Sequence, residues 1–449
     1  MFSFEVCAKK VNLVCEINKE LCTRCGTCAG VCPKNCFIFD DKNYPRLIYS
    51  KCVQCGLCTR ICPGSKFNTN FFSQKLFGKN YNPNDILGNF MVSYVGYALD
   101  ENLRRLATSG GIATAILICL LEQKMINGAI VTVPNYNNPE ISEPIIALTK
   151  DTLLSGAQSK YTIVPVNKIF KELGKIDGKF ALVGLPCHVQ AFRKLSENCP
   201  SLASKISVVI GLYCGRTMEQ EATLSLIRML GIKLTQLRKI QYRGGNWPGE
   251  FRAYLKNGTY FSCHKDIYMY LNRLYCTRRC LLCIDYSAEF ADISLADAWT
   301  IERNTWKYPG GQTIVLVRTK PGLEVLNLVK NKGYVKLQEI SRETAIETHR
   351  GISSIKKKGA MIRITWLKNR GKQYPDYGVL FFDYSWRDIL GEIRRSSGIA
   401  VGQFFLSRKL IESFVFILLR EYCQIETKSK AKRVFLKIIN FFMKKWFDW

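Results

Sequence analysis

The sequence predicts a mixed fold class, in which a small α+β domain is followed by a larger α/β domain and a C-terminal helical tail. Three observations carry this prediction: cysteines crowd into the first 66 residues, strands alternate with helices from Met91 onward, and the chain ends in basic, amphipathic segments. We expect five parts: an N-terminal domain (1–66), a linker (67–90), the α/β domain (91–345), an extension of its core (346–395) and the tail (396–449).

Composition excludes several classes of protein. The 449 residues are 47% hydrophobic and 12% aromatic, which is enough to bury a core and excludes a largely disordered chain. The net charge of +29 comes without a helix-turn-helix, zinc-finger or RNA-binding signature, so we expect no nucleic-acid partner. An acidic protein or an anionic membrane surface fits the charge better. No signal peptide and no run of 18 apolar residues is found, so the expected location is cytoplasmic.

The N-terminal cysteines form a repeated unit, C-x2-C-x2-C-x3-C-P. Three thiolates at this spacing can surround one iron–sulfur cubane, while the fourth, before proline, binds the other cluster. The repeat resembles a bacterial two-cluster ferredoxin domain, with structural zinc sites as the alternative. The run between the units reads as a short hairpin, and Cys7, Cys15 and Cys36 read as ordinary thiols. The two predicted [4Fe–4S] clusters are held by Cys22, Cys25, Cys28 and Cys62, and by Cys52, Cys55, Cys58 and Cys32.

The α/β domain follows from alternating strand and helix patterns. Apolar runs at 91–100, 128–134, 179–184 and 206–214 predict strands, and 109–123, 186–195 and 218–230 predict helices. This alternation favours a largely parallel sheet. The helix at 109 begins with a Ser-Gly-Gly turn, which is either a structural turn or a phosphate-receptive helix N-terminus.

Further cysteines follow two of the predicted strands. Cys187 and Cys214 each come directly after a strand, so parallel strands would bring both to one sheet edge. The compact trio Cys276, Cys280 and Cys283 could join one of them, or Cys263, in a third [4Fe–4S] cluster. A zinc site and plain thiols are the alternatives.

Six motifs resemble one family when read in order: SGGIATA, SGAQSKY, GLPCHVQAFRK, GLYCGRT, YRGGNWPGEF and CTRRCLLCIDYSAEFADISLADAW. The chain resembles the coenzyme F-420 hydrogenase/dehydrogenase beta-subunit family over residues 15–310, with the ferredoxin domain in front. The resemblance implies an iron–sulfur flavoprotein with an α/β FAD-binding catalytic domain that exchanges hydride with a deazaflavin. Some relatives instead reduce chlorophyll-type tetrapyrroles, and others accompany surface polysaccharide synthesis.

The resemblance also implies roles for particular residues. Lys160 would face the FAD pyrophosphate or the N1–C2=O edge of the flavin, and His188 would either donate a proton or cap and pack its helix. Asp292 and Asp297 match the family's ADIxxGD ending, with Ala296 in place of the usual Gly. The other residues expected at the cofactor are Ser109, Gly110, Gly111, Ser159, Tyr161, Arg243, Gly244 and Gly245.

The expected function is that of an oxidoreductase that couples single electrons from the clusters to hydride transfer between FAD and a small-molecule substrate or coenzyme F-420, with a surface-polysaccharide role as one setting. Residues 1–70 hold ten Lys and Arg against five Asp and Glu, so we expect an acidic ferredoxin as the electron donor. Electron flow in the opposite direction, from a deazaflavin hydride to the clusters, would use the same cofactors. The alternatives are a non-catalytic electron-transfer subunit that docks on a partner enzyme, and a relative that has lost its flavin.

The tail reads as two amphipathic helices that end in Trp446 and Trp449. Aromatic and aliphatic side chains on one side and basic ones on the other are typical of an interfacial helix, so peripheral contact with the inner face of a membrane is one interpretation. Packing on the protein's own body or on a partner is the other.

Overall fold

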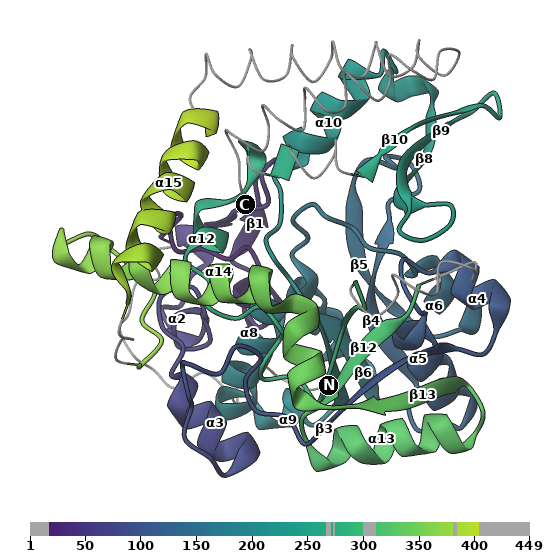
Figure 1. Ribbon diagram of the computed structural model, residues 1–449, viewed down its shortest axis with the longest axis horizontal. Helices are drawn as coiled ribbons and strands as arrows, with labels where there is room; N and C mark the ends of the chain where they lie inside the picture. The colour runs from purple at the N-terminus through teal and green to yellow at the C-terminus, as the bar shows by residue number, and fades with distance from the viewer. Residues whose placement is uncertain (1–17, 266–270, 273, 300–310, 380–383, 404–449) are drawn as a thin grey trace.

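The computed structural model describes residues 18–265, 271–272, 274–299, 311–379 and 384–403 (Figure 1). Cys7, Cys15 and the predicted tail helices beyond residue 403 lie outside the described residues. The described chain is built around an eight-stranded sheet, with an N-terminal lobe (residues 18–66) and a three-stranded sheet packed around it.

The N-terminal lobe contains two similar cysteine-bearing turns. Each turn ends in a glycine with left-handed backbone, Gly26 at φ 84° and Gly56 at φ 66°, and a one-turn helix follows each of them. The predicted hairpin between the turns is confirmed, with Phe37 opposite Leu47 in an antiparallel pair. The lobe's elements are α1 (Thr27–Gly30), β1 (Phe37–Phe39), β2 (Pro45–Leu47), η2 (Tyr49–Lys51) and α2 (Leu57–Arg60).

The segment expected to be a linker is partly helical. Helix α3 (Thr69–Phe77) begins where the Asn68 side chain accepts a hydrogen bond from the backbone N–H of Phe71. Phe67 and Phe72 are buried and stack at 4.7 Å between ring centroids. The linker prediction over 67–90 is therefore wrong for this stretch, because its aromatic residues pack into the core.

The central sheet is mixed. Its strand order is β13-β3-β12-β11-β7-β6-β4-β5, and only β11, β7, β6 and β4 run parallel to their neighbours within that group. The expectation of a largely parallel sheet holds for these inner strands and fails for the outer ones, which pair antiparallel. The strands are β3 (Val92–Ala98), β4 (Gly128–Pro134), β5 (Ser142–Ala147), β6 (Phe180–Gly184), β7 (Ile206–Leu212), β11 (Ile293–Asp297), β12 (Thr313–Val317) and β13 (Val335–Ile340).

Helices cover both faces of this sheet. One core cluster joins α5 and α13 to one face, and another joins α8, α7 and the N-terminal lobe to the other. These helices and their short neighbours are α4 (Glu101–Leu106), α5 (Ile112–Glu122), α6 (Lys150–Ser155), η3 (Val166–Ile169), α7 (Phe170–Leu173), α8 (Pro186–Asn198), α9 (Pro200–Ala203) and α13 (Lys320–Asn331).

A second core lies between β7 and β11 in the sequence. It packs α10 against the three-stranded antiparallel sheet, seen at the top right of Figure 1. Its elements are α10 (Gln220–Met229), η4 (Leu234–Gln236), β8 (Leu237–Gly244), β9 (Glu250–Leu255) and β10 (Tyr260–His264).

Three helices complete the described chain: α12 (Arg278–Leu281), α14 (Arg342–Asn369) and α15 (Trp386–Gln403). The expected boundaries after residues 345 and 395 fall inside α14 and α15, so they do not divide structural units. Helix α14 is capped by Ser341, whose hydroxyl accepts from the Thr344 N–H. Among the helices described, none is both long and apolar enough to cross a membrane.

Candidate functional site

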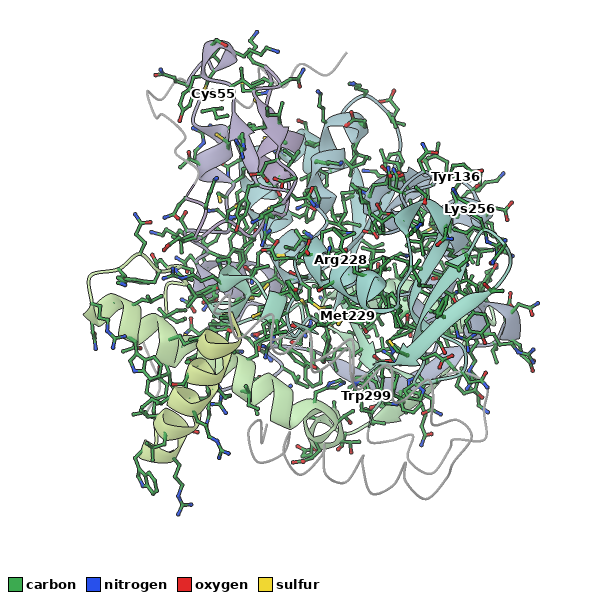
Figure 2. The ribbon with its side chains drawn as sticks, turned by 90° about the horizontal axis from the view of Figure 1, so that it is seen from above. Cys55, Tyr136, Arg228, Met229, Lys256 and Trp299 are labelled. Carbon is green, nitrogen blue, oxygen red and sulfur yellow. The ribbon has the colours of Figure 1, made fainter. Side chains whose placement is uncertain are left out.

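Four cysteines surround an outer cavity in the N-terminal lobe. The cavity is lined by Cys32, Cys52, Cys55 and Cys58. Figure 2 shows Cys55 at the outer edge of the molecule. Apolar side chains from both strands of the hairpin and the buried thiol of Cys36 also line it. The fold therefore gathers around one space the same four cysteines that the repeat assigned to its second cluster.

A middle group of cysteines lies deeper in the lobe. Burial raises the pKa of the Cys22 thiol to about 12, and the neighbouring thiols of Cys25 and Cys62 add to this rise. The pKa of Cys62 is raised by burial and by Cys25. Cys28 belongs to the short helix α1 that follows Cys25. Cys62, the last cysteine of the second repeat, thus lies beside Cys22 and Cys25 of the first repeat, as the crossed ligation pattern requires.

An inner group forms where the sheet edge meets α12. Burial raises the pKa of Cys187 well above its usual range, and the thiols of Cys214, Cys25, Cys280 and Cys283 contribute to the rise. The pKa of Cys214 is raised by burial, by Cys280 and by Cys283, with Lys356 opposing. Since β6 and β7 are parallel neighbours, the predicted convergence of Cys187 and Cys214 at one sheet edge is what the fold produces.

Two other cysteines that were candidates for this group, Cys276 and Cys263, do not join it directly. Cys276 forms a backbone bridge with Met218, and its thiol lies beside Arg216, which opposes the rise in pKa that burial causes. Cys263 pairs with Phe251 across β10 and β9 inside the second core. The structure therefore brings together Cys187, Cys214, Cys280 and Cys283, and Cys276 stands at the side of this group near Cys280.

Within the described ranges, no three Cys, His, Asp or Glu side chains converge closely enough to hold one metal ion. Each cysteine of a [4Fe–4S] cubane binds a different iron, so its four thiolates are spread around the cluster. The observation therefore concerns a mononuclear site, such as zinc, rather than a cubane.

A second cavity, of about 280 Å³, lies between the 155–160 loop and β8. Ser159, Lys160, Lys239 and Tyr242 line it, and none of its described lining residues is Asp or Glu. The Lys160 ammonium donates hydrogen bonds to the carbonyls of Gly156 (2.7 Å) and Ala157 (2.8 Å). Burial and the nearby Lys239 lower the pKa of Lys160 to about 7. Two lysines without a carboxylate suit an anionic ligand.

The Ser109–Gly111 turn borders the same loop, and its polar groups form hydrogen bonds within the protein. The backbone N–H of Ser159 donates to the Thr108 hydroxyl at 2.8 Å, which joins the two motifs. The Ser109 hydroxyl donates to the carbonyl of Gln312 (2.6 Å), and the Gly110 N–H donates to Thr313 (3.0 Å). These hydrogen bonds fix the turn against β12 and the segment before it.

Arg243 is locked at the end of β8. Its Nη1 lies 2.6 Å from Asp297 Oδ2, and its Nε donates to the Pro248 carbonyl at 2.7 Å. Although burial opposes it, Asp297 and Tyr161 hold the pKa of Arg243 above its usual range. Gly244 and Gly245 continue into the turn toward β9, which packs on Arg252. Arg243 thus ties the second core to the strand that carries Asp297.

A histidine outside the predicted site joins this network. His349 of α14 lies 2.7 Å from the Asp297 carbonyl and 3.0 Å from the Tyr286 hydroxyl. A carbonyl can only accept, so Nε2 carries the proton and Nδ1 accepts from Tyr286. No motif marks His349 or Tyr286, because their contact depends on how α14 packs rather than on sequence spacing.

His188 lies at the start of α8 and caps that helix. It is 4% exposed, and its Nδ1 accepts a hydrogen bond from the Leu185 N–H at 3.1 Å, at the start of α8. Burial lowers its pKa to about 4, so the imidazole is neutral at neutral pH. These contacts are the ones that the capping and packing alternative expects. Asp292 is likewise structural, because it accepts from Arg193, Val209 and Thr319.

Comparison with known proteins gives consistent matches. The family models for the N-terminal and C-terminal parts of the coenzyme F-420 hydrogenase/dehydrogenase beta subunit match residues 93–171 and 177–343. The chain is 28% identical to the coenzyme F-420 hydrogenase subunit beta of Methanococcus voltae over 258 residues, which cover 56% of this chain and 86% of that protein.

Two further likenesses extend this result. The coenzyme F-420-dependent sulfite reductase of Methanocaldococcus jannaschii is 27% identical over 73% of this chain, and the match spans 48% of that protein. The solved structure of the F-420-reducing [NiFe] hydrogenase complex from Methanosarcina barkeri contains a chain that superposes with a TM-score of 0.54 at 23% identity. That superposition covers 65% of this chain and 98% of the other, and it concerns the fold.

Proposed function

The chain belongs to the coenzyme F-420 hydrogenase/dehydrogenase beta-subunit family, and from this premise we propose that it is an iron–sulfur flavoprotein subunit that passes electrons between a redox partner and a deazaflavin-type hydride carrier. Its relatives are named as hydrogenase, dehydrogenase and sulfite reductase proteins, which supports an oxidoreductase. These names favour a subunit of a larger assembly over a stand-alone enzyme, and the proposal does not include the surface-polysaccharide role.

One observation carries the proposal: the cysteines form three groups in sequence from the outer edge of the lobe to the sheet edge. Cys55 belongs to the outer group, Cys25 to the middle one and Cys187 to the inner one, and Cys25 and Cys187 are near enough to influence each other. Three [4Fe–4S] clusters held by these groups would provide stepwise one-electron transfer.

The second cavity is the proposed place of FAD. Lys160 and Lys239 would hold an anionic part of the cofactor, and Ser159 would position it beside the loop. The cavity is bounded by Tyr242, the residue that precedes the buried Arg243 on β8. Bound FAD supplies the exchange between hydride and single electrons. The task of these residues is to bind and orient it, and Arg243 and Asp297 keep the wall rigid.

Cofactor content tests the proposal directly. We expect anaerobically purified protein to contain about one FAD and about 12 iron atoms per chain, four for each of three clusters. Cys55→Ala should lose about four of these irons, because Cys55 belongs to the repeated cysteine unit that is proposed to bind the outer cluster. Cys36 lines the same cavity but lies outside both repeated units, so Cys36→Ala should keep them. Iron assay and chromatography of released flavin give both numbers. A wild type without flavin after reconstitution, or equal iron in the two variants, would contradict the proposal.

The subunit role is tested by isolating the chain. The purified chain, reduced coenzyme F-420 and a one-electron dye acceptor form the complete assay. Turnover by the isolated chain would place the hydride exchange within it, as the cavity beside Lys160 favours. If dye reduction occurs only with a partner enzyme present, the chain is an electron-transfer module without hydride chemistry of its own.

A further inference from the structure

We propose that the ammonium of Lys356, on α14, raises the reduction potential of the inner [4Fe–4S] cluster. The proposed ligands of that cluster are Cys187, Cys214, Cys280 and Cys283. The inference rests on the proposed function for the presence of that cluster. It goes further because Lys356 lies beyond residue 343, where the match to the family models ends.

The packing of α14 places this lysine against the inner cysteine group. Lys356 is 7% exposed, and its Nζ donates a hydrogen bond to the backbone carbonyl of Cys214. Farther along the same helix, Arg363 Nε donates to the Leu281 carbonyl at 2.8 Å, which fixes α14 on the segment between Cys280 and Cys283. These two contacts hold α14 against the segments that carry Cys214, Cys280 and Cys283.

Neighbouring cations of α14 form ion pairs with carboxylates. Among the residues that the structure describes, no carboxylate lies within ion-pair distance of Lys356, and Asp285 acts on it from farther away. Lys357 lies 2.9 Å from the buried carboxylate of Glu289, and Arg363 forms an ion pair with Glu392. The hydrogen bond described for Lys356 goes to a neutral carbonyl. The ammonium therefore lies directly against the backbone of one of the four inner cysteines.

A fixed positive charge has a defined effect on a cluster. Reduction adds one negative charge, and a buried cation stabilises that charge more strongly than water does, because the surrounding dielectric constant is low. Net charge and hydrogen bonding around the sulfurs are the levers by which a protein sets cluster potential. Lys356 would therefore favour the reduced state of the inner cluster.

The experiment is a redox titration of the holoprotein followed by electron paramagnetic resonance. We expect Lys356→Met to lower one of the cluster midpoints and to leave the others unchanged. The expected loss is about tenfold in the reduced-to-oxidised ratio of that cluster at fixed potential, which is about 59 mV for one electron. Lys356→Arg should stay close to wild type because it keeps the charge. Lys358→Met removes the same charge from a half-exposed position beside Asp388 and should shift nothing.

Each result is decisive. Midpoints in Lys356→Met that equal those of the wild type, or that move as they do in Lys358→Met, would overturn the inference. Lys356→Gln is titrated in parallel, so that the conclusion does not depend on one variant assembling its clusters. A wild type that contains only the two clusters of the N-terminal lobe would instead refute the proposed function, and iron content separates that failure from an unchanged potential.

Discussion

Two lysines meet at the second cavity, and their shared environment makes one of them titrate near neutrality. Lys160 is half-buried beside Lys239, and the loss of solvation together with the Lys239 charge lowers its pKa to about 7. His188 shows the same effect of burial on a different residue, since its pKa falls to about 4 and it remains neutral. Burial therefore gives Lys160 a protonation state that changes near physiological pH and removes such a change from His188.

Lys160 should make FAD binding depend on pH. Below about pH 7 the side chain is charged and attracts an anionic cofactor, and above it the neutral amine loses that attraction. We expect FAD affinity to weaken by about tenfold, roughly 1.4 kcal/mol, between pH 6 and pH 8. Fluorescence titration of the apoprotein with FAD measures this change.

Lys160→Met should bind FAD weakly at both pH values, with the pH dependence gone. Lys256→Met is the matched control, because Lys256 is exposed in the turn between β9 and β10 and does not line the cavity. Retention of the full pH dependence in Lys160→Met would show that another group controls binding.

Helix α1 docks on the core through its glycines. A Cβ at Gly26 would lie 2.7 Å from the Pro165 carbonyl, and one at Gly30 would lie 2.1 Å from the Asn167 carbonyl. The Asn167 side chain donates to the Thr27 hydroxyl at 2.9 Å, and its backbone N–H donates to the Cys25 carbonyl at 2.8 Å. Close backbone approach thus fixes the middle cysteine group against η3.

Gly26→Ala should weaken this contact. We expect the free energy of unfolding to fall by about 2–4 kcal/mol, because the clash with Pro165 adds to the cost of left-handed backbone. Gly78→Ala is the control: Gly78 is also left-handed, at φ 63°, but a Cβ there meets nothing within 4 Å, so only the cost of about 1–2 kcal/mol should appear. Denaturant unfolding compares the two, and equal losses would show that the docking contact tolerates the methyl group.

The N-terminal lobe and the core behave as one unit at the scale of the whole molecule. Arg24 of the lobe makes two hydrogen bonds of 2.8 Å to the Glu219 carboxylate, and its side chain is 1% exposed. Arg279 of α12 donates to the carbonyls of Leu21 and Gly64. These contacts hold the lobe and its cysteines in place against the core, as the proposed electron transfer between clusters would require.

Arg24→Met should loosen the lobe from the core. We expect a loss of about 3 kcal/mol in the free energy of unfolding, because Glu219 is left without its buried partner. Arg46→Met breaks an ion pair with Asp40 in which the Arg46 side chain is 59% exposed, so about 0–1 kcal/mol is expected. Denaturant unfolding of the two variants measures both losses in the free energy of unfolding. If the two variants lose the same stability, Arg24 does not join the lobe to the core in the way described.

Much of this protein follows from local patterns in its sequence. Short stretches of chain are enough to predict the cysteine units and the family motifs. They are also enough to predict the hairpin at 37–47 and the strands at 128–134 and 180–184. The antiparallel outer strands could not be predicted in this way, because β12 and β13 come after a long insertion and their direction depends on their partners.

What the sequence by itself determined is the family and the repeated cysteine units that are proposed to bind clusters, because cysteine spacing and ordered motifs are local. What only the tertiary structure decided is which distant residues meet: Cys187 and Cys214 with Cys280, His349 with Tyr286, and Lys356 with the Cys214 carbonyl. The physical reason is that each of these contacts joins elements far apart in the chain, and helix and sheet packing rather than sequence spacing sets their distances.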